Sequence, residues 1–221
     1  MVVRRLALPA LVAVLLTPAV APSARSAAST LKPAATPAAA KSDTAIFAGG
    51  CFWCMETQFE SFPGVKSVES GYTGGHKANP TYEQVSAHTT GHLESVRVVF
   101  DPAVTTYAAL LERYWYGIDP TQTGGQFCDE GSPYATAIFY RNDAQKRAAL
   151  DSRAALQRSG RLKKPIVTEI RAASVFWPAE GYHQDYWKKE PDRYRAYREG
   201  CGRDSWLEKL WGAKAVKPLV H

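Results

Sequence analysis

The sequence predicts an α+β domain in which helices pack on one face of a mostly antiparallel sheet. Apolar runs and amphipathic stretches alternate in the order strand, helix, strand, strand, helix, strand. Of the 221 residues, 45% are hydrophobic and 22% are charged, as in ordinary soluble domains. This length supports one sizeable core, so we expect a single domain between two irregular ends.

Each predicted element has a local reason. Strands are expected at residues 44–48, 65–72, 94–100, 135–140 and 166–170, and helices at residues 51–61, 107–116 and 143–159. The strand at 94–100 is the clearest, because Val96 and Val98 alternate with other residues. The first helix carries Phe52, Met55 and Phe59 at helical spacing. Asn142 is a suitable N-cap for the last helix.

Two long segments and the end of the domain lack such patterns. Residues 76–90 and 119–133 are rich in turn formers and are predicted to be loops. Loops longer than about 12 residues are uncommon and are usually functional. From Ala179 onward we expect loop mixed with short helix, rich in Tyr and Trp.

The N-terminus has the features of a targeting segment. Arg4 and Arg5 precede an apolar run over residues 6–20, which is too short for a comfortable membrane span. We therefore interpret residues 1–28 as a signal peptide and residues 29–42 as an Ala/Pro-rich linker. The prediction is an exported protein, periplasmic or extracellular, which stays membrane-anchored if the segment is not cleaved. Residues 215–221 are expected to be a short tail.

The net charge of +6 suggests nucleic acid only at first sight. Several of the basic residues lie along one predicted helix, where they alternate with Ala and Leu: Arg141, Lys146, Arg147, Arg153 and Arg158. That pattern is typical of a solvated helix face, so we expect no nucleic-acid partner.

The four cysteines are Cys51, Cys54, Cys128 and Cys201. In an oxidising compartment an even number suggests structural bridges. A domain of this size folds without them, however, and the loop between Cys51 and Cys54 is too short for a strong staple. Reactive chemistry explains that pair better.

Cys51 is a plausible nucleophile because it follows Gly49-Gly50 and opens a helix. Unpaired N–H groups and the helix dipole favour thiolate there. A buried structural thiol is the simpler alternative. The Cys-x-x-Cys spacing also suits a thioredoxin-like dithiol exchanger or a zinc site. No βαβ pattern precedes the pair and no second ligand pair follows it, so we expect neither, and no metal.

Several motifs in order resemble one enzyme family. These are Gly50-Cys51-Phe52-Trp53, Ser70-Gly71-Tyr72-Thr73-Gly74-Gly75, Asn79-Pro80-Thr81-Tyr82-Glu83, Thr90-Gly91-His92-Leu93-Glu94, Asp119-Pro120-Thr121, Gly125-Gln126-Phe127-Cys128-Asp129, Pro178-Ala179-Glu180 and Tyr182-His183-Gln184. Together they resemble the A-type peptide methionine sulfoxide reductases. The resemblance implies a catalytic domain over residues 43–214 and a ferredoxin-like two-layer sandwich with long loops.

The resemblance also implies roles for named residues. Cys51 would attack the sulfoxide sulfur of the S-epimer, and Glu94 would be the acid that protonates the oxygen, which requires a desolvated carboxyl group. Tyr82 and Tyr134 would hydrogen-bond that oxygen. Without the resemblance, Glu94 reads as a surface charge and the two tyrosines as ordinary loop residues.

The remaining implied residues support the same site. Phe52 and Trp53 would hold the substrate methyl group, although plain core packing also explains them. Asp129 would support the polar network, and His183 would lie nearby with no role that we can assign.

A second thiol must then form a disulfide with the Cys51 sulfenic acid. Cys54 is close in sequence, whereas Cys201 lies in a flexible Gly200-Cys201-Gly202 tail, so both are candidates and Cys54 is preferred. Cys128 is expected to be a buried thiol. The resemblance implies a monomer without a cofactor, which repairs oxidised proteins or free methionine sulfoxide. An external thioredoxin-like reductant would recycle it.

Overall fold

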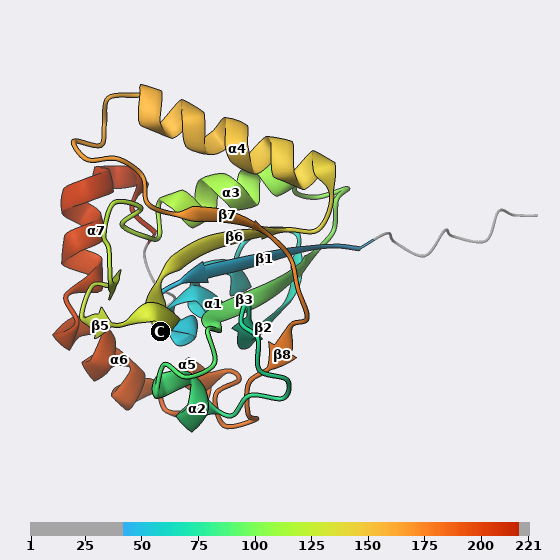
Figure 1. Ribbon diagram of the computed structural model, residues 1–221. Helices are drawn as coiled ribbons and strands as arrows, with labels where there is room; N and C mark the ends of the chain where they lie inside the picture. Colours follow the sequence, from blue (N-terminus) through green and yellow to red (C-terminus); the bar gives the residue numbers. More distant parts are fainter. Residues whose placement is uncertain (1–41, 217–221) are drawn as a thin grey trace, which may run out of the picture. The chain divides into compact units, whose positions relative to one another are not determined.

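The computed structural model describes residues 42–216, and its centre is a six-stranded mixed sheet (Figure 1). From edge to edge the strands are β7 (Glu169–Ala172), β6 (Thr136–Tyr140), β1 (Asp43–Gly49), β3 (Leu93–Phe100), β2 (Val65–Thr73) and β8 (Trp177–Pro178). All neighbours are antiparallel except β6 and β7, which are parallel. The predicted α+β class and mostly antiparallel sheet are confirmed.

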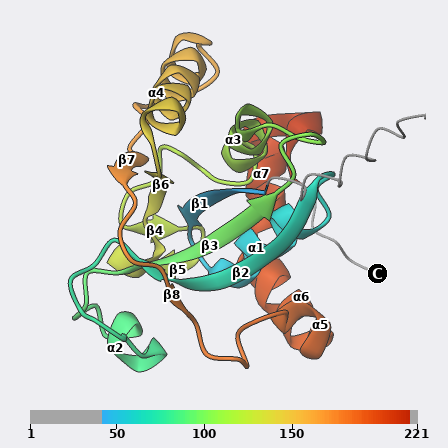
Figure 2. The same ribbon diagram turned by 90° about the vertical axis from the view of Figure 1, so that its right-hand side faces the viewer.

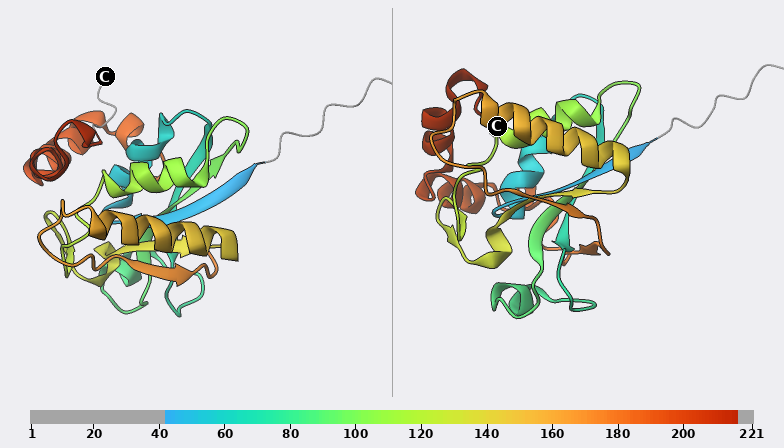
Figure 3. Two further views of the ribbon diagram at one scale, coloured as in Figure 1. Left: turned by 90° about the horizontal axis from the view of Figure 1, so that it is seen from above. Right: turned by 45° about the horizontal axis from the view of Figure 1, so that its top comes forward.

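Three helices cover one face of this sheet: α1 (Phe52–Glu60), α3 (Tyr107–Trp115) and α4 (Asp143–Arg158). Figures 1 and 3 show α3 and α4 side by side over that face. The predicted Asn142 cap is confirmed, because its side chain accepts a hydrogen bond from the backbone N–H of Gln145 at 2.9 Å. Thr106 caps α3 in the same way.

The central strand β1 explains why both faces of the sheet need cover. Successive side chains of a strand point to opposite faces. Ala45 and Phe47 face the helices, whereas Ile46 and Ala48 belong to a smaller apolar cluster on the other face. Phe47 is fully buried and stacks on the ring of Phe59 at 5.1 Å. Burial of such a side chain stabilises the fold by roughly 1.5–3 kcal/mol.

The two predicted loops contain short elements that the periodicity did not reveal. Within residues 76–90, α2 (Tyr82–Ser86) starts with a capping box between Thr81 and Gln84. Within residues 119–133, β4 (Gly125–Gln126) and β5 (Asp129–Glu130) form a small hairpin. Elements of two to five residues are too short for a periodic pattern to form.

The last predicted strand, residues 166–170, begins too early in the chain, and β8 was not predicted. Residues 166–168 lie outside the sheet, and the backbone N–H of Val167 donates to the carbonyl of Pro120 at 2.8 Å. Strand β7 begins only at Glu169, where it pairs with Ala137 of β6. An apolar run alone does not separate a sheet strand from an extended segment packed beside it.

The C-terminal part is more helical than predicted. It contains α5 (Tyr186–Lys189), α6 (Pro191–Gly200) and α7 (Arg203–Trp211), which Figure 2 shows in orange and red. Trp211 is 1% exposed, and its indole N–H donates to the carbonyl of Ile118 at 2.9 Å. The helices α6 and α7 are therefore packed onto the domain, and residues 200–202 join them rather than forming a flexible tail.

The predictions for residues 1–28 and 29–41, and for residues 217–221, lie outside the described residues. Within residues 42–216, no helix is both long and apolar enough to cross a membrane.

Candidate active site

The turn between β1 and α1 places Cys51 at the first helical turn. Gly50 has φ +83°, and a Cβ there would lie 2.7 Å from the Cβ of Gln126, so both conformation and space favour glycine. A Cβ on Gly49 would lie 2.5 Å from the sulfur of Met55. Cys51 is the N-cap of α1, as predicted, and keeps 6% of its surface exposed.

Cys51 and Cys54 are both free and buried on the first turn of α1. Their hydrogen bond lowers the pKa of Cys54 to about 6, burial opposes this, and Arg203 and Arg198 lower it further. Burial raises the pKa of Cys51 well above its usual value, and the neighbouring Cys54 adds to this rise. The pair therefore loses its first proton easily and its second with difficulty. The two hydrogen-bonded sulfurs therefore hold a single negative charge between them.

Glu94 lies against the backbone of the same turn. It is 3% exposed, and its carboxylate accepts a hydrogen bond from the backbone N–H of Phe52 at 3.0 Å. Burial raises the pKa of Glu94 to about 8, although this hydrogen bond opposes the rise. Desolvation of the carboxyl group, which the resemblance required, is confirmed, and Glu94 is mostly protonated at neutral pH.

Asp129 reaches the site from the β4–β5 hairpin. Its carboxylate accepts a hydrogen bond from the hydroxyl of Tyr197 on α6 at 2.6 Å. Burial raises the pKa of Asp129, and the Tyr197 hydrogen bond and the charge of Arg203 oppose the rise. Asp129 in turn raises the pKa values of Cys51 and Glu94, so the three groups share one electrostatic environment.

Tyr82 begins α2, and Tyr134 ends the 3₁₀ turn η1 (Ser132–Tyr134). Both side chains are half-buried. Burial raises the pKa of each hydroxyl, and nearby Glu94 and Cys51 act in the same direction. Both tyrosines therefore stay protonated near neutral pH and can donate hydrogen bonds beside the sulfur and the carboxyl group.

Phe52 and Trp53 belong to an aromatic cluster centred on His183. Phe52 is 1% exposed, and its ring lies 4.9 Å from that of His183. Trp53 is half-buried, stacks on Tyr186 at 3.8 Å, and donates its indole N–H to Nδ1 of His183 at 3.2 Å. Burial lowers the pKa of His183, so it is neutral and braces both residues of the Phe-Trp pair.

Glu180 belongs to one of the family motifs but had no predicted role of its own. One carboxylate oxygen accepts from the backbone N–H of Tyr82, and the other accepts from the hydroxyl of Tyr72, each at 2.8 Å. Tyr72 is the cross-strand partner of Glu94. Glu180 thus connects the short helix that carries Tyr82 to the strand pair that carries Glu94.

Two predictions about the other cysteines are wrong. Cys128 is exposed rather than buried, and it forms a disulfide with Cys201, with a Cα–Cα distance of 5.0 Å. Cys201 is the C-cap of α6, where its N–H donates to the carbonyl of Tyr197, so it is held by the helix and by the disulfide. Both sulfurs are engaged, and Cys54 is the free thiol beside Cys51.

In the described part of the chain, one group of potential metal ligands lies close together, namely Cys128, Asp129 and Cys201. The disulfide occupies both of its sulfurs. The cysteines of the Cys-x-x-Cys pair are not part of this group.

The structure therefore brings together the five catalytic residues that the resemblance implied. Each of them lies close enough to at least one other to change its pKa: Cys51, Glu94, Tyr82, Tyr134 and Asp129. The structure adds Glu180, Tyr197, Arg198 and Arg203. A usable signal existed for Tyr197, because Tyr194, Tyr197 and Arg198 lie at helical spacing after Pro191, a favoured first residue of a helix. We see no such signal for Arg203.

Sequence comparisons agree with this geometry. The family model described as peptide methionine sulfoxide reductase matches residues 43–215. The peptide methionine sulfoxide reductase MsrA of Bacillus licheniformis is 56% identical over 176 residues, covering 80% of this chain and 97% of that protein. The same protein of Bacillus subtilis is 54% identical over 174 residues, covering 79% and 98%.

Solved structures show the same fold. The reduced form of Mxr1 from Saccharomyces cerevisiae has a TM-score of 0.65 at 27% identity, covering 69% of this chain and 88% of that chain. Methionine sulfoxide reductase A of Corynebacterium diphtheriae has a TM-score of 0.61 at 31% identity, covering 68% and 76%. With the family model matching nearly all of the described residues, this chain belongs to the peptide methionine sulfoxide reductases and is an enzyme of their A type.

Proposed function

We propose that the enzyme reduces the S-epimer of methionine sulfoxide, free or in oxidised proteins, through a sulfenic acid on Cys51. The observation that carries this proposal is the shared position of nucleophile and acid. Cys51 caps α1, and the next backbone N–H, that of Phe52, holds the buried carboxyl group of Glu94. We also interpret the order β6-β1-β3-β2, with α1 and α3 on one face, as the ferredoxin-like sandwich that the resemblance implied.

The first step transfers the oxygen of the sulfoxide from the substrate sulfur to the sulfur of Cys51. The sulfur of Cys51 attacks the sulfoxide sulfur while its hydrogen-bonded neighbour Cys54, as the thiolate, takes its proton. Glu94 protonates the sulfoxide oxygen, and Tyr82 and Tyr134 stabilise the charge that develops on it. The bond between the substrate sulfur and its oxygen then breaks as the protonated oxygen forms a bond to the sulfur of Cys51. The transient bond between the two sulfurs also breaks, methionine leaves, and Cys51 is a sulfenic acid. Proton return to Glu94 restores the acid.

The second step closes a disulfide. The sulfur of Cys54 attacks the sulfur of the Cys51 sulfenic acid, the S–O bond breaks, and the oxygen leaves as water with the proton from Cys54. Cys54 is preferred to Cys201 because Cys201 is bonded to Cys128. A thioredoxin-like dithiol would then reduce the new disulfide and take up its oxidising equivalents.

Turnover of the two purified epimers of a methionine sulfoxide peptide tests the reaction. We expect the S-epimer to be reduced and the R-epimer to be left. Cys51→Ser should abolish turnover, and Glu94→Gln should lower it about a hundredfold, since a general acid contributes on that order. Turnover that survives Cys51→Ser, or equal rates for both epimers, would overturn the proposal.

Export is part of the proposal. Arg4, Arg5 and the apolar run after them suit a signal peptide, and a disulfide between Cys128 and Cys201 suits an oxidising compartment. Cell fractionation followed by mass spectrometry of the intact protein tests this. We expect a processed N-terminus near Ala28 outside the cytoplasm, and a full-length cytoplasmic protein would contradict export.

A further inference from the structure

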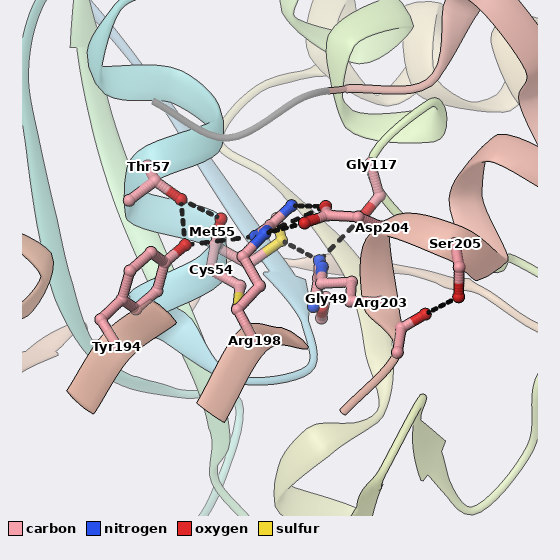
Figure 4. Close-up of polar contacts among 11 residues, drawn as sticks. Gly49, Cys54, Met55, Thr57, Gly117, Tyr194, Arg198, Arg203, Asp204 and Ser205 are labelled. Carbon is pink, nitrogen blue, oxygen red and sulfur yellow. Dashed lines mark hydrogen bonds and ion pairs between the residues drawn. The ribbon is translucent and has the colours of Figure 1, made fainter. Parts of the chain in front are cut away.

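Two buried arginines from the C-terminal helices lie against the first turn of α1. Arg198 near the end of α6 is 4% exposed, and Arg203 at the start of α7 is 1% exposed. Figure 4 shows both side chains reaching toward the turn that carries Cys54 and Met55. Arginine is rarely buried to this degree without a paired anion, so the partners of each guanidinium identify its task.

Arg203 has neutral partners only. Its Nη2 donates to the carbonyls of Gly49 at 3.2 Å and Gly117 at 2.8 Å, and lies 3.6 Å from the sulfur of Met55. Its guanidinium also sits 4.5 Å from the ring centre of Phe127. Nε and Nη1 have no hydrogen-bond partner, and among residues 42–216 no carboxylate lies within 4.0 Å of it. Such a buried charge is strongly destabilising unless an anion balances it.

Arg198 is tied to the cysteine turn by a chain of hydrogen bonds. Its Nη1 contacts the hydroxyl of Tyr194 at 3.2 Å, which contacts the hydroxyl of Thr57 at 2.8 Å, and Thr57 donates to the carbonyl of Cys54 at 3.0 Å (Figure 4). Arg198 is also held by two contacts of its Nε to the carboxylate of Asp204 at 3.0 Å. Its charge is thus largely compensated, whereas that of Arg203 is not.

The anion that balances Arg203 must come from its own surroundings. The titratable groups facing the thiol pair and the two arginines lie on seven elements: Tyr82 on α2, Glu94 on β3, Tyr114 on α3, Asp129 on β5, Tyr134 on η1, Tyr194 and Tyr197 on α6, and Asp204 on α7. Glu94 is mostly protonated at neutral pH, and burial keeps all five tyrosines protonated. Asp204 is already paired with Arg198. Asp129 and the Cys51–Cys54 pair remain as the candidates.

We propose that Arg203 is a positioning residue that stabilises the single negative charge of the Cys51–Cys54 pair, with Arg198 as the weaker, compensated second cation. The charge of Arg203 favours ionisation of Cys54 more than that of Arg198 does. Arg203 also lowers the pKa of Asp129, but the Asp129 carboxylate forms no ion pair with this guanidinium within 4.0 Å and takes its hydrogen bond from the Tyr197 hydroxyl at 2.6 Å. This inference rests on the proposed function, since the charge matters because the pair is the redox centre.

The test is a titration of the reduced enzyme by thiolate absorbance near 240 nm, with Cys51→Ser/Cys54→Ser as the baseline that removes the pair. We expect Arg203→Met to move the first ionisation of the pair upward by about one pH unit or more, because one nearby opposite charge shifts a pKa by that amount. Relative to the wild type at the same pH, sulfoxide turnover should fall about fivefold or more at pH 6, and the two rates should become equal at pH 9.

Matched variants separate charge from fold. Arg203→Lys keeps a cation, so the first ionisation of the pair should stay close to its wild-type value. Arg195→Met removes an exposed arginine of α6 and should leave the titration unchanged.

An Arg203→Met titration that superimposes on that of the wild type, with intact near-UV dichroism, would overturn the proposal. Loss of the shift in an Asp129→Asn background would also overturn it, by making Asp129 the true counterion. If the Met variant does not fold, the Lys variant and Arg198→Met carry the same comparison. The titration needs no sulfoxide, so its failure is distinct from failure of the reductase proposal.

Discussion

Cys51 and Cys54 are three residues apart, buried and reduced, whereas Cys128 and Cys201 are 73 residues apart, partly exposed and joined. A cross-link stabilises a fold mainly by restricting the unfolded chain, so its benefit grows with the loop that it closes. That relation gives about 2 kcal/mol for the short loop and about 4 kcal/mol for the long one. The first pair can therefore cycle at little cost to stability, and the second pair suits a permanent staple.

The staple also lies next to the reaction centre. Cys128 precedes Asp129 in the β4–β5 hairpin, and Cys201 falls between Arg198 and Arg203 in the α6–α7 segment. The disulfide thus joins the hairpin that supplies a carboxylate to the segment that supplies two cations. In the proposed mechanism the first pair performs the chemistry, and the second pair joins the two segments that carry the charges around it.

The largest expected difference between the pairs is in turnover. With thioredoxin as reductant, Cys54→Ser should lose roughly three orders of magnitude or more in steady-state rate, because an intramolecular resolving step is replaced by a bimolecular one. Cys128→Ser/Cys201→Ser should stay within a few-fold of the wild type at 25 °C. The measurement is the amount of methionine that each variant forms per unit time with thioredoxin as reductant.

A count of methionine per enzyme sharpens this result. Fully reduced wild type without added reductant should form one methionine per chain if only the first pair reacts. Cys54→Ser should also form one and stop as the sulfenic acid. Two methionines per wild-type chain, or a Cys51–Cys201 bond in the mass spectrum, would show that the second pair takes part.

Stability should show the opposite ranking. Cys128→Ser/Cys201→Ser should lower the free energy of unfolding in urea by about 4 kcal/mol, the chain-entropy value for its loop. Cys51→Ser/Cys54→Ser, whose wild-type thiols are free, should change it by much less. If reduction of the wild type leaves its urea midpoint unchanged, the bond between Cys128 and Cys201 is not a staple.

The fold followed from the sequence wherever periodicity extended over several residues. Residues 44–48, 65–72 and 94–100 became β1, β2 and β3 with small changes at their ends. Elements set by tertiary contacts were missed or displaced. The α2 turn needs Glu180 at the backbone N–H of Tyr82, and β7 begins only where β6 offers a parallel partner. The start of β7 is contained in no local pattern, whereas α2 did carry one, the capping box of Thr81 and Gln84.

The site was predictable only in part for the same reason. The motifs carried Cys51 and its neighbours, and burial of Glu94 could have been inferred, because it shares a strand face with Val96, Val98 and Phe100, all of which are buried. The Cys128–Cys201 pairing could not, since four cysteines allow three pairings. Arg203 was hidden because a lone arginine after Gly202 reads as a surface charge.

The smallest expected difference between the pairs is in the pH dependence of the rate. Only the Cys51–Cys54 pair should contribute to it. The monoanion of the Cys51–Cys54 pair forms as pH rises through about 6, so the rate should fall tenfold per unit below that value. Glu94 must be protonated to act as an acid. Because its pKa is about 8, activity should be lost as pH rises through about 8, which gives the alkaline limb of the profile.

Cys128→Ser/Cys201→Ser should keep both limbs, because a disulfide has no proton to lose. Glu94→Gln should lose the alkaline limb and keep the acid one in a profile of kcat/KM against pH. An alkaline limb that persists in Glu94→Gln would assign that proton to another group, with Asp129, whose pKa burial also raises, as the next to test.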